Sequence, residues 1–278
     1  MNLGWLESIL YSFISGLTEF LPISSSAHQE IMLSFFGADG RDPVRDFLVH
    51  LAVMLSLYSV TKPFFEQIQR EQKMRRYNRG GLSHPSRAIL EYRFIKNASI
   101  PLLVGLLILT YLSGLIGNSL LVISVFLLIN GVILFLPQRM MQGNKDVRSM
   151  TYLDSIIIGL SASLSAFSGI SRVGCMTSVG AAQGADKKNA LNWALLLSIP
   201  ALAGLLFIDL FQIIAMFGSI NLWNNILTYL LSVIFAYLGG YASVLLIRFI
   251  SINIGFSVFM YYSWGASLLY FLLYLFVV

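Results

Sequence analysis

Two ionisable residues, Glu19 and Arg172, interrupt long apolar stretches of the sequence. A charge at the centre of a membrane helix costs about 2.5–3.5 kcal/mol on insertion scales, so such residues indicate a functional site. Small polar residues accompany both: Ser24, Ser25, Ser26 and His28 follow the acidic residue, and Ser168, Gly169 and Ser171 precede the basic one. The guanidinium group offers a planar fork of donors that suits phosphate oxygens. Together with serine hydroxyls, it predicts an anion site.

His28 is the residue of its segment that titrates near physiological pH. If a helix begins near Ser26, then His28 lies in the first turn, within reach of Ser24 or Ser25. A neutral imidazole there could take a serine proton. His50 is predicted to line the same cavity, or to face a neighbouring helix.

Structural interpretations of the same residues stay open. Ser26 and Gln29 fit a capping box, so the serine could serve only to start a helix. Glu19 and Arg172 could form an ion pair that only holds segments together. Asp209, near the end of another apolar stretch, is interpreted as an interfacial residue.

The composition places these residues in a membrane protein. Of 278 residues, 57% are hydrophobic and 11% are charged, and the mean hydropathy is +0.77. A soluble domain carries about 25% charged residues, so a soluble enzyme, a nucleic-acid binder and a disordered protein are excluded. At roughly 20 apolar residues per span, there is room for six or seven spans. The single cysteine, Cys175, excludes a disulfide framework.

Basic residues predict the orientation. Eight of the 18 lysines and arginines lie between Arg70 and Lys96, and others lie at Arg139–Arg148, at Lys187-Lys188 and at Arg248. By the positive-inside rule these loops are cytoplasmic, and Gly37–Asp46 is external. The net charge of +5 therefore requires no nucleic acid, and anionic membrane lipids are the expected neighbours.

The expected fold is an all-α polytopic membrane protein with six transmembrane helices and two re-entrant helical hairpins. The predicted spans are Val44–Glu66, Ala98–Gly117, Leu120–Pro137, Asn189–Phe217, Ile226–Ile247 and Ile254–Val278. The predicted hairpins pair Leu3–Leu21 with Ala27–Gly37, and Asp154–Phe167 with Gly174–Ala185. A complete crossing by Leu3–Leu21 is the alternative to the first hairpin.

A single domain, 1–278, then contains two repeats, about 1–137 with a cytoplasmic basic loop at 67–97, and about 151–278. Each reads hairpin, span, span, span. Because three spans is an odd number, the second repeat is inverted relative to the first. Inverted repeats with broken helices place their site near the midplane, where the breaks meet.

Two motifs resemble a known family. Residues 16–28 read Gly-Leu-Thr-Glu-Phe-Leu-Pro-Ile-Ser-Ser-Ser-Ala-His and closely resemble the first signature of the undecaprenyl-pyrophosphate phosphatase family, the bacitracin-resistance type. Residues 168–174 read Ser-Gly-Ile-Ser-Arg-Val-Gly and resemble its second signature, Pro-Gly-x-Ser-Arg-Ser-Gly. Length, segment order and Ser198-Ile199-Pro200 also agree, so the resemblance covers essentially the whole chain.

The resemblance implies a multi-pass phosphatase of the bacterial cell membrane whose site faces the external side. It hydrolyses C55 polyprenyl diphosphate to the monophosphate and so recycles the lipid carrier for peptidoglycan synthesis. Glu19, Ser25, His28 and Arg172 match the family's essential residues. Ser24, Ser26, Gly169 and Ser171 match flanking phosphate-site positions, and His50 is added as a substrate-binding residue.

The roles follow as hypotheses. Arg172 and the half-helix termini hold the diphosphate. Ser25 is the nucleophile with His28 as base, or as acid for the leaving group, and direct attack by a water that His28 activates stays open. Glu19 orients His28 or holds a divalent cation, Mg²⁺ or Ca²⁺. Phosphoryl transfer depends mainly on positioning and charge stabilisation, which this set supplies.

Three departures from the signatures matter. Ser15 replaces the first acid of the usual Glu-x-x-x-Glu, Ser168 replaces the proline of the second signature, and Val173 replaces its second serine. The first loss weakens a cation site, and the last removes one hydroxyl from the phosphate cradle.

The alternative function is a transporter or flippase for polyprenyl phosphate, or for a related amphiphilic anion, without hydrolysis. Retention of Ser25 with His28 favours hydrolysis, because a binding site needs donors but no nucleophile and base. A structural subunit leaves Glu19 and Arg172 unexplained. Lipid chain length stays open, as does the choice between an active monomer and a homodimer.

Overall fold

The computed structural model describes residues 3–38, 40–77, 85–140, 143–216, 225–253 and 255–277. Across these ranges the chain is helical, and one isolated bridge joins the backbones of Lys145 and Ala185. The helices are α1 (Trp5–Glu19), α2 (Ser25–Phe35), α3 (Pro43–Tyr77), α4 (Arg87–Ile116), α5 (Leu120–Arg139), α6 (Tyr152–Ser163), the 3₁₀ turn η1 (Leu164–Ala166), α7 (Arg172–Ala182), α8 (Lys187–Ala215), α9 (Ile226–Asn253) and α10 (Ser257–Val277).

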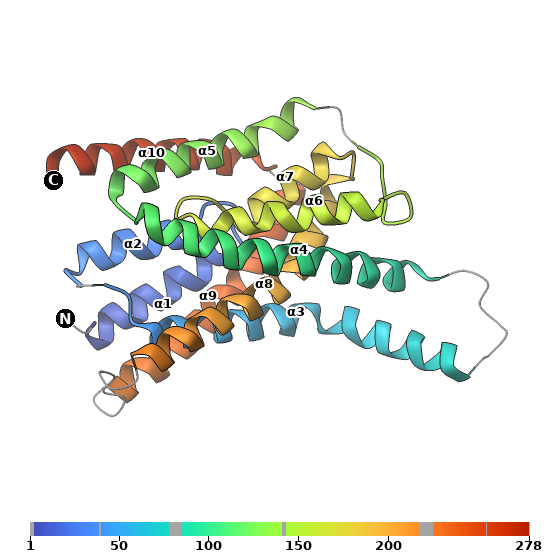
Figure 1. Cartoon of the computed structure of the whole chain (residues 1–278), viewed down its shortest axis with the longest axis horizontal. Coiled ribbons are helices and arrows are strands. Elements are labelled where there is room, and N and C mark those ends of the chain that lie inside the picture. Colours follow the sequence, from blue (N-terminus) through green and yellow to red (C-terminus); the bar gives the residue numbers. More distant parts are fainter. Residues whose placement is uncertain are drawn as a thin grey trace.

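Six of these helices, α3, α4, α5, α8, α9 and α10, are long and apolar enough to cross a membrane. The all-α polytopic class with six spans is therefore confirmed. Many of their apolar side chains are exposed, Ile108 and Leu268 among them, as expected of surfaces that contact lipid. Figure 1 shows α3, α4, α5 and α10 lying roughly along the long axis, with α3 and α4 in opposite chain directions and α8 oblique to them.

The predicted loop over 67–97 is wrong at both ends, because α3 continues to Tyr77 and α4 already begins at Arg87. Pairs of polar side chains one turn apart explain the extra turns: Arg70 lies 3.4 Å from Glu66, and Arg87 lies 3.0 Å from Glu91. Such pairs stabilise a helix that protrudes into water. At 35 residues, α3 is about 52 Å long, well beyond a hydrocarbon core of about 30 Å.

Two pairs of short helices complete the fold. Helix α1 packs against α2, and α6 packs against α7. With 15 and 11 residues, α1 and α2 are about 22 and 16 Å long, too short for a complete crossing. The chain breaks twice, as predicted. The second break, at 167–171, lies close to its predicted position, whereas the first, at 20–24, lies two residues before the predicted 22–26, because α2 already begins at Ser25. The placement of these pairs as re-entrant hairpins, and their inverted relationship, stay predictions.

Small residues let the broken helices sit deep in the bundle. Helix α1 lies closely against α9, and a Cβ atom on Gly16 would stand 2.3 Å from the carbonyl oxygen of Ala236. Only glycine permits that approach, a pattern typical of packed membrane helices.

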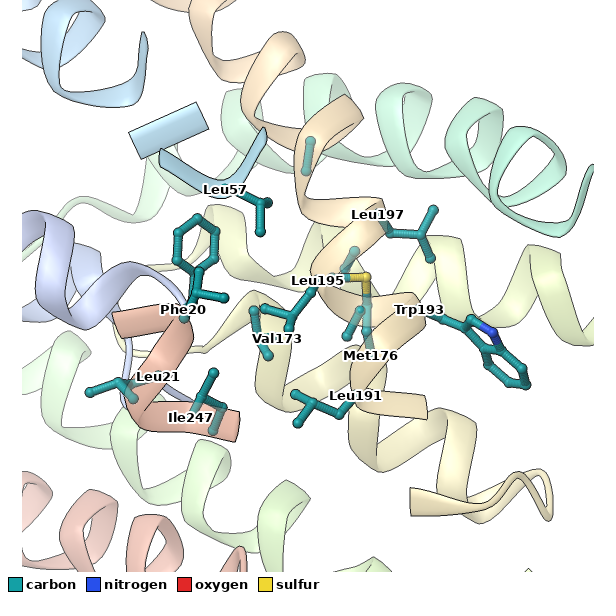
Figure 2. Close-up of a cluster of buried hydrophobic side chains, with 14 of the residues drawn as sticks. Phe20, Leu21, Leu57, Val173, Met176, Leu191, Trp193, Leu195, Leu197 and Ile247 are labelled. Carbon is teal, nitrogen blue, oxygen red and sulfur yellow. The ribbon is translucent and has the colours of Figure 1, made fainter. Parts of the chain in front are cut away.

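The apolar core joins both breaks to the spans around them. Figure 2 shows Phe20 beside Leu57 of α3, and Val173 and Met176 of α7 beside Leu195 of α8. All five side chains are almost inaccessible to solvent. The two breaks therefore pack against one common apolar core, which fixes them relative to one another.

Candidate functional site

The two breaks are tied to each other by hydrogen bonds. The backbone N–H of Gly169 donates to Ser24 Oγ over 3.0 Å, and Ser171 Oγ donates to the carbonyl of Leu21 over 3.2 Å. Asn130 of α5 bridges them, since its Nδ2 donates to the carbonyl of Pro22 and its Oδ1 accepts from the N–H of Ser171. The prediction that the two motifs meet is confirmed.

Serines start both short helices. Ser24 Oγ accepts from the N–H of Ala27 and caps α2, and Ser171 Oγ accepts from the N–H of Gly174 and caps α7. The predicted capping box at Ser26 is therefore wrong, since this residue lies inside α2. Ser24 has a φ of 66°, which is rare and strained for a residue other than glycine.

Glu19 at the end of α1 and Arg172 at the start of α7 form a buried ion pair. The pair uses one terminal nitrogen of the guanidinium group. Its Nε and Nη1 are buried and have no hydrogen-bond partner within the described part of the chain. Buried donors of a charged group are costly when unsatisfied, and oxygens of a phosphate are suitable acceptors.

A polar cavity of about 230 Å³ opens beside this pair. It is lined by residues of α1, α2, α3, α4, η1, α7 and α8, of the second break and of the loops that precede α3 and α5: Glu19, Ser25, Ser26, Gln29, Arg41, Asp46, His50, Thr110, Asn118, Ser165, Ala166, Ser168, Ile170, Ser171, Arg172, Leu205, Ile208, Asp209 and Gln212. Two arginines, several hydroxyls and a floor of apolar side chains suit an anionic headgroup.

Six of the nine predicted site residues line this cavity, namely Glu19, Ser25, Ser26, His50, Ser171 and Arg172. Ser24 and Gly169 do not line it and are hydrogen-bonded to each other. His28 is not among the lining residues.

His28 instead faces α10. Its Nδ1 lies 2.7 Å from the carbonyl of Ser24, its Nε2 lies 2.6 Å from the hydroxyl of Tyr262, and the two rings stack. Ser25 Oγ donates to the carbonyl of Ser15 over 3.1 Å and accepts from Gln29. The expectation that His28 lies within reach of Ser24 or Ser25 is therefore met at the backbone carbonyl of Ser24, whereas the hydroxyl of Ser25 bonds Ser15 and Gln29 instead.

Sequence reasoning predicted His50 of α3 at the cavity but missed its partner on α8. Asp209, expected at an interface, is buried, and its Oδ2 lies 2.6 Å from Nδ1 of His50. The signal was present: a lone carboxylate in an apolar stretch, the same argument that selected Glu19.

Arg41 lines the cavity where its side chain stays 31% exposed, which we take as the cavity mouth, and its guanidinium lies 2.8 Å from the carboxylate of Glu30 and 3.5 Å from that of Asp46. Asp46 also accepts a hydrogen bond from the hydroxyl of Tyr11. Burial lowers the pKa of Arg41, but the charges of Asp46 and Glu30 outweigh this effect and raise the pKa above its ordinary value. A second permanent cation therefore stands about the cavity.

The donors do not fit a resident divalent cation. Within the residues that the structure describes, no three His, Cys, Asp or Glu side chains are grouped to hold a metal ion. The carboxylate of Glu19 pairs with Arg172, and Ser15 supplies no second carboxylate beside it.

Comparisons with known proteins place the chain in a family. The family model described as bacitracin resistance protein BacA matches residues 8–269. The chain is 30% identical over 275 residues to an undecaprenyl-diphosphatase of Methanobrevibacter smithii, covering 96% of each chain. It is 29% identical over 272 residues to undecaprenyl-diphosphatase 3 of Bacillus cereus, and 27% identical over 274 residues to an undecaprenyl-diphosphatase of Thermodesulfovibrio yellowstonii; these cover 96% and 97% of each chain, respectively. On these matches, the chain belongs to the bacitracin resistance protein BacA family.

Proposed function

We propose that this protein is an undecaprenyl-diphosphatase, which hydrolyses C55 polyprenyl diphosphate to the monophosphate and inorganic phosphate and so recycles the cell-wall lipid carrier. The relatives that carry this name match almost the whole chain. The observation that carries the proposal is Arg172, buried beside a cavity with two donors unsatisfied. The polyprenyl chain would extend from the cavity toward the apolar surfaces of the spans.

The diphosphate is held by charge and by helix termini. Arg172 directs its free donors to the terminal phosphate, and Arg41 attracts the anion at the mouth. Helices α2 and α7 both begin at the breaks, and the positive ends of their dipoles favour a phosphate there. This arrangement stabilises the negative charge that spreads over the transferring phosphoryl group.

Ser25 is the proposed nucleophile, because its hydroxyl lines the cavity at the first turn of α2. Its oxygen forms a bond to the terminal phosphorus while the bond to the bridging oxygen breaks, and polyprenyl monophosphate departs. Water then hydrolyses the phosphoserine and releases inorganic phosphate. Direct attack by water gives the same products, and single turnover in labelled water separates the two routes by the presence or absence of a phosphorylated enzyme.

The site is proposed to face the outside of a bacterial cell membrane. The cavity lies beside the start of α3 and the end of α4, whereas the exposed basic side chains Arg70 and Arg87 lie at the opposite ends of these helices. Figure 1 shows these opposite ends pointing the same way. The positive-inside rule assigns them to the cytoplasm.

The test is phosphate release from undecaprenyl diphosphate by the protein purified in detergent. Arg172→Ala should abolish release, and Ser25→Ala should lower it steeply. Arg139→Ala, at the far end of α5, is the matched control and should retain it. A parallel series with EDTA or added Mg²⁺ decides the cation requirement, which stays a prediction.

Wild-type protein that is folded and binds the lipid, yet releases no phosphate, would overturn the proposal. Movement of polyprenyl phosphate across liposome membranes would then be the activity to measure.

A further inference from the structure

The cavity holds a candidate acid–base group besides His28. Both ring nitrogens of His28 are engaged, by the carbonyl of Ser24 and by Tyr262, and its side chain lies outside the cavity lining. Of the described histidines, only His50 lines the cavity. We propose that His50, oriented by Asp209, is a further residue that transfers protons during hydrolysis, in addition to His28 of the first motif; this inference rests on the proposed function.

The pair has the geometry of an oriented imidazole. His50 of α3 and Asp209 of α8 are both buried, and the two helices pack against each other. Because the carboxylate is an acceptor, the nitrogen at 2.6 Å, Nδ1, carries the proton. This fixes the tautomer and leaves Nε2, which forms no hydrogen bond within the described part of the chain, as the proton acceptor.

Neither residue belongs to the two signature motifs, and each would be costly in a span without a function. A buried aspartate in an apolar helix must be compensated, and the imidazole compensates it. A purely structural tie between α3 and α8 would need no access to the cavity, yet both side chains line it.

Charged groups around His50 come from four helices and one loop. Asp46 lies one turn earlier on α3, Glu19 ends α1, Arg172 begins α7, Asp209 comes from α8 and Arg41 precedes α3. Three carboxylates favour the imidazolium form once it is produced, and two arginines oppose it. With three carboxylates against two arginines, the surroundings carry net negative charge, which allows His50 to hold a proton between two steps.

The proton balance is simple. Nε2 of neutral His50 takes the proton from the attacking hydroxyl, of Ser25 or of water, as the new bond to phosphorus forms. The bond between phosphorus and the bridging oxygen breaks, and the imidazolium returns the proton to that oxygen on the departing monophosphate. On the serine route, a water then loses a proton to His50 as it attacks the phosphorus. The bond between phosphorus and Ser25 Oγ breaks, the imidazolium returns the proton to that oxygen, and inorganic phosphate leaves.

The experiment measures kcat, KM and their pH dependence for His50→Gln, His50→Gly and Asp209→Asn beside the wild type. General acid–base catalysis contributes about 10²–10⁴-fold, so His50→Gln should lower kcat by about 100-fold or more with little change in KM. Added imidazole should restore part of the rate in His50→Gly. Asp209→Asn should lower kcat and displace the acidic limb of the pH profile.

The matched control is Tyr237→Phe. Its hydroxyl ties α9 to Ser59 of α3 over 2.9 Å, outside the cavity, so its loss removes an interhelical bond without touching the site. It should leave kcat and the pH profile unchanged. Thermal unfolding of each variant in detergent separates misfolding from lost chemistry, and Asp209→Asn preserves the shape of the pair if the histidine variants do not fold.

If the wild type releases phosphate and His50→Gln releases it at a similar rate with an unchanged pH profile, the assignment of His50 is overturned and the proposed function is not. Loss without imidazole rescue and without any change in the profile of Asp209→Asn would reduce the pair to a structural tie. A wild type without phosphatase activity would overturn both this inference and the proposed function.

Discussion

The backbone N–H of Gly169 donates to the hydroxyl of Ser24 over 3.0 Å, although the residues lie 145 positions apart. Both occupy the left-handed region, with φ of 119° and 66°. The same hydroxyl caps α2, so one serine fixes the start of a helix and its distance from the second break. Glycine adopts such a φ without cost, whereas Ser24 is strained, which indicates that the packing around the first break holds it in a conformation that the segment would not adopt alone.

Gly169→Ala should damage this junction. A Cβ atom there would lie 2.6 Å from Cβ of Phe126 and 2.9 Å from the carbonyl of Ile123, in addition to its unfavourable φ. Backbone strain of this kind costs about 1–3 kcal/mol, and the contacts add to it. The free energy of unfolding in mixed micelles should fall by at least that amount, and phosphate release should fall with it.

Gly114→Ala is the control, because nothing lies within 4 Å of a Cβ atom at that position of α4. It should be neutral or slightly stabilising, since alanine favours a helix over glycine. Equal effects of the two changes would contradict the account of Gly169.

Asn130 should be the most sensitive of the uncharged residues. It is fully buried, and it bonds Pro22, Ser171 and Ser263. Asn130→Ala leaves backbone groups of both breaks unsatisfied, at about 1–3 kcal/mol each. Ser263→Ala removes only one of the three bonds and should cost less. Unfolding measurements on both variants test this order, and a larger loss in the serine variant would contradict it.

Sequence predicted the parts of the site whose residue types carry a free-energy cost in a membrane. Glu19 and Arg172 stood out because charge is expensive in a membrane helix, and the structure pairs them. The breaks are indicated by the short apolar segments Ala27–Gly37, Asp154–Phe167 and Gly174–Ala185, whereas Leu3–Leu21 alone was long enough for a complete crossing. Local pattern and the solvent sufficed for these inferences, and neither required knowledge of which helices pack together.

The missed parts depend on three-dimensional neighbours. Spacing placed His28 one turn from Ser25, but Tyr262 on the distant helix α10 decides where its ring points. The partner of Asp209, His50, lies 159 positions away in the sequence, so only the structure shows that the two side chains form a pair. The charged extension of α3 was predicted as a loop because hydropathy describes the membrane and not the helix that continues beyond it.

Separate and joint removal of Glu19 and Arg172 should reveal strong coupling. Truncation of either partner strands a buried charge, which destabilises by about 3–5 kcal/mol, whereas the double alanine variant removes both charges and should lose less than the sum. A double-mutant cycle of unfolding free energies measures the difference. The exposed pair Lys62 and Glu66 is the control, with coupling below about 1 kcal/mol. Additive losses at Glu19 and Arg172 would indicate that the pair is not formed in the membrane protein.

Arg41→Gln should raise KM more than it lowers kcat, because this arginine stands at the cavity mouth and acts on the arriving diphosphate. Its neighbours Asp46 and Glu30 raise its pKa above an already high value. A cation with a raised pKa contributes its stabilisation fully below the unfolded pKa, so its effect on both KM and unfolding should be constant from about pH 6 to pH 10. Kinetics across that range, with Arg70→Gln near the far end of α3 as control, provide the test. A KM effect of Arg41→Gln that disappears within this range would show that its charge does not act on the substrate as proposed.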